Sequence, residues 1–168
     1  MFKKILVPVD GSDSSMVAAE VAANIAMKNE GVIKLLYVVR PYLIQYPKAN
    51  AGTGSPESLA PVGAVELGKA VVEKIKKEIS ATDVRIETEL AYGNPAQVTV
   101  SAAKTDEYDL IVMGSRGISG LTGSLIGSVS QSVSHMAPCP VLLTRLHKDV
   151  KEERKMVKAM PSEYTIYL

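Results

Sequence analysis

The chain has 168 residues, the length of one domain, and its content of 46% hydrophobic and 22% charged residues is ordinary for a soluble globular protein. Its formal net charge of +1 and its 5% of aromatic residues give neither a basic field nor a stacking platform, so we expect no nucleic-acid partner. No apolar run reaches the length of a membrane span, and the single cysteine, Cys139, excludes an internal disulfide. These features predict a cytoplasmic protein with no membrane partner.

The first 40 residues predict a strand–helix–strand unit. Residues 5–9 form an apolar, β-branched run typical of a strand buried on both faces, and Ser12 is a plausible helix N-cap. The helix that follows has a predicted core stripe of apolar residues four apart, with alanines beside them: Val17, Val21 and Ile25. Gly31 is expected to end this helix, and residues 32–39 read as the second strand. A unit this short predicts a parallel strand pair with a right-handed crossover.

The rest of the chain continues the alternation after a Pro- and Gly-rich loop over residues 41–63. A second helix is predicted with one apolar face, made of Val65, Val72, Ile75 and Ile79. Residues 84–90 alternate strictly, which predicts an edge strand, and Asn94-Pro95 begins a third helix. A fourth strand (110–113), a fourth helix (to 136) and a fifth strand (140–144) follow. The sequence therefore predicts an α/β fold: a Rossmann-like doubly wound sheet of five parallel strands with helices on both faces.

A glycine-rich segment follows the fourth strand and indicates phosphate binding. Glycines let a backbone approach an anion, and a helix N-terminus favours negative charge. The segment is not a P-loop, because no lysine lies between Gly114 and Ser130, and it has no G-x-G-x-x-G motif. A solvated linker is the alternative. Asp10 follows the first strand as Gly114 follows the fourth, so the two would share one crevice if those strands are neighbours at the switch point.

The spacing Gly114-x2-Gly117-x9-Gly127-Ser128 resembles the ATP-binding signature of the universal stress protein family. Further segments resemble that family in the right order: KKILVPVDGS, LLYVV, YGNPA, LIVMGSRG and LIGSVSQSVSHMAPCPVLL. The resemblance runs from Phe2 to about Arg145. It divides the chain into a nucleotide-binding domain, residues 1–146, and a C-terminal extension, residues 147–168.

The resemblance implies that ATP is bound, with a Mg²⁺ ion bridging its phosphates and no metal-ligating side chain. Adenine would lie between the residue pair after strand one and the end of strand two, which are Val9, Asp10, Val38 and Val39. The ribose and phosphates would be held by Gly114, Arg116, Gly117, Gly127, Ser128 and Ser130, with Met113 and Val129 adding backbone or apolar contact. The family also commonly forms homodimers through strand five, which here holds Val141, Leu142 and Leu143.

Several of these residues have a simpler structural alternative. Asp10 has an equally plausible role as a cap for the first helix, and Arg116 is alternatively a surface arginine. Ser128 and Ser130 are alternatively N-cap residues of the fourth helix. Each of these alternatives is a question of local geometry.

The resemblance implies an ATP-binding regulatory protein of the stress response that acts through a nucleotide-dependent homodimer. The alternative is a slow ATPase or phosphate-transfer enzyme on the same fold. The loop has no lysine and no evident general base, so the chain is not expected to have catalytic residues. A dimerisation module without nucleotide is the third reading, and the complete glycine signature argues against it.

The extension is not covered by the resemblance. Residues 148–158 have a weak helical stripe among charges of both signs, and residues 164–168 form an uncharged run with high β-propensity. We expect this end to add a strand to a sheet edge or to lie across a partner subunit. The alternative is a frayed terminus.

Overall fold

A computed structural model describes residues 1–40, 63–80, 83–116 and 126–145. Within these ranges the order of elements is β1 (Lys4–Val9), α1 (Asp13–Asn29), β2 (Val32–Val39), α2 (Ala64–Ile79), β3 (Arg85–Tyr92), α3 (Pro95–Thr105), β4 (Leu110–Gly114), α4 (Ser128–Met136) and β5 (Val141–Thr144). This alternation of strands and helices is the predicted one. The expectations for residues 147–168 lie outside the described residues.

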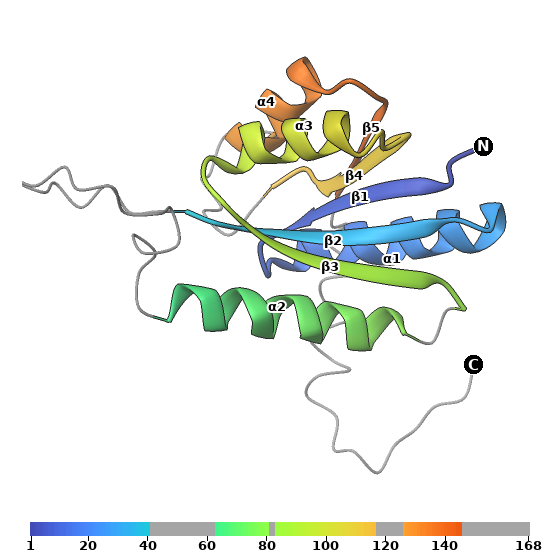
Figure 1. Ribbon diagram of the computed structural model, residues 1–168, viewed down its shortest axis with the longest axis horizontal. Helices are drawn as coiled ribbons and strands as arrows, with labels where there is room; N and C mark the ends of the chain where they lie inside the picture. The colour runs from blue at the N-terminus through green and yellow to red at the C-terminus, as the bar shows by residue number, and fades with distance from the viewer. Residues whose placement is uncertain (41–62, 81–82, 117–125, 146–168) are drawn as a thin grey trace, which may run out of the picture.

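The five strands form one parallel sheet in the order β3-β2-β1-β4-β5. Helices α1 and α2 lie against one face, and α3 and α4 lie against the other (Figure 1). The predicted doubly wound α/β fold is therefore confirmed. The strand with strict alternation, β3, is at one edge as predicted, and β5 is at the other.

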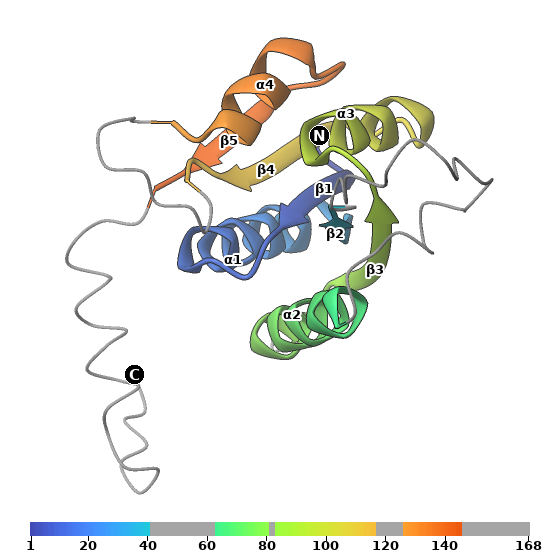
Figure 2. The same cartoon turned by 90° about the vertical axis from the view of Figure 1, so that its left-hand side faces the viewer.

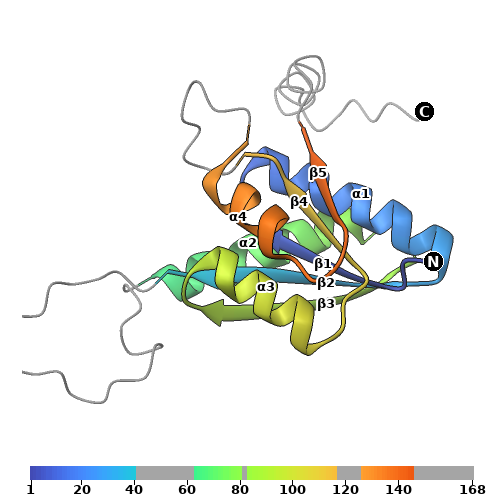
Figure 3. The ribbon, with the colours of Figure 1, turned by 90° about the horizontal axis from the view of Figure 1, so that it is seen from above.

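The core has two halves, one on each face of the sheet. On the α1/α2 face, strand residues such as Ile5, Val7 and Ile33 are buried against the helices. On the α3/α4 face, which is nearer the viewer in Figure 3, Leu6 and Ile111 are buried. Neighbouring residues of β1 thus enter opposite halves, which explains why residues 5–9 of β1 and 110–113 of β4 are apolar without interruption.

Helix α1 contacts the sheet mainly through alanines, at one side of the predicted apolar stripe. Its fully buried residues are small: Ala18, Ala19, Ala22, Ala23 and Ala26. The larger side chains Val17, Val21 and Ile25 are only partly buried, and Val21 and Ile25 pack against the edge of the core, so the alanines beside the expected stripe form its centre. Alanine lets the helix backbone lie close to the strands, and the β-branched residues then cover the flanks of the contact.

The helix ends follow local sequence signals, with one correction. The Ser12 side chain accepts the N–H of Ser15, and the Asn94 side chain accepts the N–H groups of the first turn of α3, as predicted. The left-handed residue that ends α1 is Glu30, at φ 53°, and not Gly31. Gly31 is needed for space, because a Cβ there would lie 2.9 Å from the carbonyl oxygen of Lys3.

Across the described ranges, no helix combines the length and the apolar character needed to cross a membrane.

Candidate functional site

The carboxyl ends of all five strands lie at one edge of the sheet, and Figure 2 looks onto this edge. Strands β1 and β4 are neighbours, but they pair only where Ile5 and Leu6 meet Leu110 and Ile111. The last three residues of each strand lie beyond this pairing. Strands β2 and β4 lie on opposite sides of β1, so the strand order reverses between β1 and β4. This position is the topological switch point, where open α/β sheets bind ligands.

The residues expected at the adenine end gather at the ends of β1 and β2. The side chains of Val9 and Val39 are 5% and 2% exposed, so a ligand would meet their backbone more than their side chains. Val38 is half-buried and packs against the α3/α4 half of the core. The backbones of two adjacent parallel strands thus end beside one another at the expected place.

Asp10 lies at the start of the β1–α1 turn, half-buried. Its Oδ1 atom accepts hydrogen bonds from the N–H of Ser12 at 3.0 Å and from the hydroxyl of Ser12 at 2.6 Å. The N-cap residue is Ser12, and Asp10 holds the Ser12 side chain in place through these hydrogen bonds. A carboxylate in this position orders the turn that follows the carboxyl end of β1.

Helix α2 packs behind this turn. Gly11 has φ +86°, and a Cβ there would lie 3.0 Å from Cγ2 of Val71. A Cβ on Gly68 would lie 2.7 Å from the ring of Tyr37, whose neighbour in the sheet is Val9. Burial, and then the negative charge of Asp10, raises the pKa of Tyr37. Tyr37 and Gly68 are contributions to the site that sequence reasoning missed; a glycine in the middle of a helix was the available signal.

At the phosphate end, Gly114 is glycine for a reason of packing. A Cβ there would lie 2.9 Å from Cβ and from the carbonyl carbon of Ser14 in α1. The hydroxyl of Ser14 donates a hydrogen bond to the carbonyl oxygen of Arg116. The side chain of Arg116 is exposed. Met113, which precedes Gly114, is 4% exposed and lies in the α3/α4 half of the core.

The first turn of α4 is fixed to the end of β4. The N–H of Gly127 donates to the carbonyl oxygen of Ser115 at 2.7 Å, and the hydroxyl of Ser130 donates to the carbonyl oxygen of Gly114 at 2.7 Å. Ser130 is 4% exposed, whereas Ser128 is exposed and Val129 is half-buried. The glycine spacing therefore brings the start of a helix onto the end of a strand, and Gly117 lies outside the described residues.

The N-cap of α4 is Gly127, and so the alternative that Ser128 or Ser130 caps this helix was wrong. Glycine has no side chain to accept the N–H groups of the first turn, whereas α1 and α3 have side-chain caps. Helix α2 also begins at a glycine, Gly63, so the feature alone does not identify a ligand. The start of α4 differs because it lies against Gly114 at the topological switch point, and a helix N-terminus in that position is suited to an anion.

Thr144, at the end of β5, completes the packing at this edge. Its carbonyl oxygen accepts the N–H of Ser115 at 2.8 Å, and its hydroxyl lies 3.3 Å from the carbonyl oxygen of Ser14. Neither Ser14 nor Thr144 was predicted from sequence, because each acts across a distance of about 30 to 130 residues along the chain. Among the residues that the structure describes, no group of three or more His, Cys, Asp or Glu side chains is arranged to hold a metal ion.

The residues expected in a dimer contact are on β5, which pairs with β4 on the side away from β1. Strand β5 is an edge strand, and Leu142 is 38% exposed on it. Val141 and Leu143 are half-buried against the α3/α4 half of the core. Met136 at the end of α4 adds a second exposed apolar side chain, at 49%.

Comparison with known proteins identifies the family of the chain. The model of the universal stress protein family matches residues 1–145. Universal stress protein YxiE of Bacillus subtilis is 36% identical over 148 residues, which cover 86% of this chain and 100% of that protein.

Two solved structures show the same fold. Universal stress protein UspA from Lactobacillus plantarum has a TM-score of 0.73 and 30% identity, over 86% of this chain and 98% of that one. A universal stress protein solved in complex with cAMP has a TM-score of 0.62 and 25% identity, over 85% of this chain and 97% of that one. On the family model and these relatives together, the chain belongs to the universal stress protein family.

Proposed function

We propose that this protein binds an adenine nucleotide, ATP with Mg²⁺, at the carboxyl edge between β1 and β4. It would serve in the cytoplasm as a regulatory protein of the stress response, acting through a nucleotide-dependent homodimer. The observation that carries the proposal is the convergence of Asp10, Gly114 and the start of α4 at the switch point. Support also comes from the related protein whose structure contains cAMP, an adenine nucleotide.

Each part of the nucleotide has a chemically suitable counterpart at this edge. Adenine would meet backbone groups of Val9, Val38 and Val39 and the carboxylate of Asp10, and the ribose would lie between Asp10 and Gly114. The phosphates would meet the N–H groups at the start of α4 (Gly127, Ser128, Val129 and Ser130) and the backbone of Gly114 and Gly117 next to Met113. The exposed guanidinium of Arg116 would pair with a phosphate oxygen.

The Mg²⁺ ion would be held mainly by phosphate oxygens and water, because Mg²⁺ retains water ligands and needs few protein groups. When bound, the ion neutralises phosphate charge. Residues 1–146 would form the binding domain and 147–168 an extension with a separate role.

The test of the site is Gly127→Val. Gly127 has φ −71° and ψ 153°, which valine adopts readily, so the expected effect does not come from backbone strain. The added methyl groups would occupy the space where phosphate oxygens meet the helix start. We expect affinity for a fluorescent ATP analogue, measured by equilibrium titration, to fall more than about tenfold while the protein stays folded.

Ser101→Val serves as the control, because it places the same side chain on an exposed position of α3. It should bind the analogue as the wild type does. If folded Gly127→Val keeps its affinity, this edge is not the phosphate site. A single-turnover assay with labelled ATP then separates a regulatory binder, which retains intact nucleotide, from a slow ATPase, which releases phosphate.

A further inference from the structure

The hydroxyl groups of Ser12 and Ser14 lie close together between the two ends of the candidate site. The hydroxyl of Ser12 donates to Oδ1 of Asp10 at 2.6 Å, and it lies 3.1 Å from the hydroxyl of Ser14. The hydroxyl of Ser14 in turn donates to the carbonyl oxygen of Arg116. Ser12 and Ser14 thus lie between Asp10, which is expected at the adenine, and the segment expected at the phosphates.

Ser14 also determines how closely α1 approaches β4. It is 8% exposed, and Gly114 lies so close to it that no Cβ fits between them. Thr144 holds the main chain of Ser14 from the side of β5, through the hydroxyl contact of 3.3 Å. Ser14 is therefore fixed in position by its surroundings, and its hydroxyl is directed at a main-chain carbonyl of the glycine-rich segment.

From this geometry we infer that Ser14 is a positioning residue for phosphate recognition. It holds residues 114–116 in the conformation in which Ser115 can accept the N–H of Gly127, and so it sets the start of α4 against the end of β4. Ser14 itself does not contact the nucleotide. Through this arrangement it selects for phosphorylated ligands and leaves recognition of the nucleoside unchanged. The inference rests on the proposed function where it is tested by ligand binding. Amide hydrogen exchange in the ligand-free protein tests it without that assumption.

The test compares Ser14→Ala with Ser15→Ala. Ser15 is the adjacent serine, 3% exposed, and its hydroxyl donates to the carbonyl oxygen of Ser12 at 2.8 Å. Each variant loses one buried hydroxyl from the same turn of α1, but only Ser14 reaches the glycine-rich segment. Both changes remove an atom and introduce no clash, so both proteins should fold.

In calorimetric titrations with adenosine and with ATP, Ser14→Ala should weaken ATP binding roughly 3- to 10-fold, which corresponds to the loss of one hydrogen bond. Adenosine binding should stay within about twofold, since the nucleoside does not reach residues 114–116. Ser15→Ala should leave the ratio of the two affinities unchanged. An equal loss for both ligands, no loss for either, or the same ratio change in Ser15→Ala would overturn the inference.

Amide hydrogen exchange in the ligand-free protein provides the independent measurement. Without the Ser14 hydroxyl, the amides of Ser115 and Gly127 should exchange faster, because Ser115, which donates one of these hydrogen bonds and accepts the other, is held less firmly. Ser15→Ala should leave both rates unchanged. If the wild type binds no adenine ligand, the proposed function fails, and these exchange rates alone then decide: faster exchange supports Ser14 as the positioning residue, and unchanged exchange excludes it.

Discussion

Thr99 is a buried residue whose hydroxyl has no hydrogen-bond partner among the described residues. It lies on α3 between Ala96 and Ala103, on the side that packs into the α3/α4 half of the core, and its exposed fraction is 0%. A buried hydroxyl without a partner is destabilising, because it has lost its hydrogen bonds to water. This is the position where the sequence departs from an otherwise apolar helix face.

We predict that Thr99→Val stabilises the protein. Valine replaces the hydroxyl by a methyl group of similar shape, and the gain in the free energy of unfolding should be about 1 to 2 kcal/mol. Urea unfolding followed by circular dichroism measures it. Thr88→Val, at an exposed position of β3, is the control and should change stability by less than about 0.5 kcal/mol. A destabilised Thr99→Val would mean that the hydroxyl has a partner in solution.

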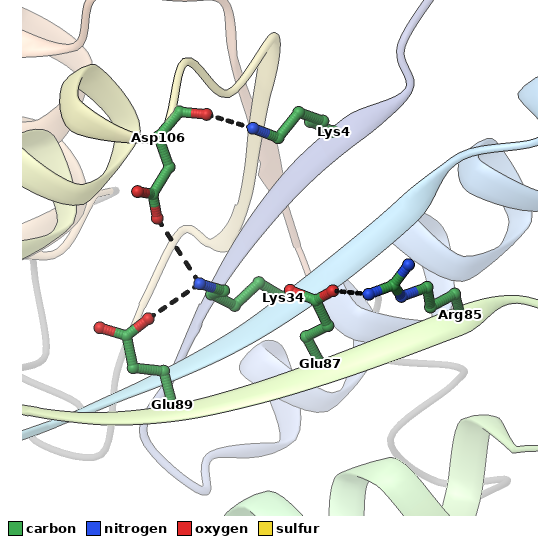
Figure 4. A network of polar contacts seen from close by, with 6 residues as sticks. All are labelled: Lys4, Lys34, Arg85, Glu87, Glu89 and Asp106. Carbon is green, nitrogen blue, oxygen red and sulfur yellow. Dashed lines mark hydrogen bonds and ion pairs between the residues drawn. The ribbon is translucent and has the colours of Figure 1, made fainter.

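At the scale of elements, the carboxyl end of α3 is held by lysines from two strands (Figure 4). The Nζ atom of Lys34 in β2 lies 3.0 Å from Oε2 of Glu89 and 3.5 Å from Oδ2 of Asp106, which is the C-cap residue of α3. Lys4 of β1 donates to the carbonyl oxygen of Asp106. Both ammonium groups also lie over the ring of Tyr108, at 6.0 and 5.4 Å from its centroid. Two positive charges at a helix C-terminus stabilise it by offsetting its negative end.

Replacing Lys34 by methionine should lower the free energy of unfolding by about 1 kcal/mol, since the two carboxylates remain 41% and 42% exposed and are still hydrated. The hydrogen bond to Glu89 raises the pKa of Lys34, and burial opposes this effect. A raised pKa means that the stabilisation is complete below the ordinary lysine value and is lost only as pH rises above it.

The difference in stability between the wild type and Lys34→Met should therefore be constant from roughly pH 7 to 10 and should narrow at higher pH. Chemical unfolding at a series of pH values checks this. Arg85→Met is the control, because Arg85 pairs with Glu87 at 2.8 Å but is 78% exposed, and such a pair contributes little. If the two variants are equally stable at pH 7, the contact at the end of α3 is not stabilising.

At the scale of the whole molecule, β5 leaves an apolar strand at the edge of the sheet, and such an edge is normally covered or paired. Pairing of two copies across a two-fold axis would cover Leu142. We therefore predict that Leu142→Asp converts a dimer into a monomer of 18.0 kDa in sedimentation equilibrium at micromolar concentration.

Leu67→Asp is the matched control, since Leu67 is 57% exposed on α2, which packs against β2 and β3, toward the sheet edge opposite to β5. It should sediment as the wild type does. A wild type that is itself monomeric under these conditions would contradict the dimer. A Leu142→Asp protein that stays dimeric would exclude β5 as the contact.

The sequence by itself determined the features that depend on neighbouring residues. The period of the apolar runs fixed which segments are strands and helices, and the cap residues Ser12 and Asn94 fixed where two helices begin. The alternation in β3 even indicated its edge position, because exposure on one face leaves a pattern in the chain. The glycine spacing identified the region of the candidate site, although the roles of its residues remain predictions.

Only the tertiary structure decided the features that depend on contacts between distant segments. Which residues of α1 form the centre of its contact depends on how closely the helix approaches the sheet, and the alanines allow a closer approach than the valines beside them. Gly114 appeared to serve a ligand alone, but its lack of a side chain is required by Ser14, 100 residues earlier in the chain. The hydroxyls of Ser14 and Thr144 leave no periodic signal. Their importance arises because the strand order places α1, β4 and β5 side by side, and no local pattern encodes which strands will be neighbours.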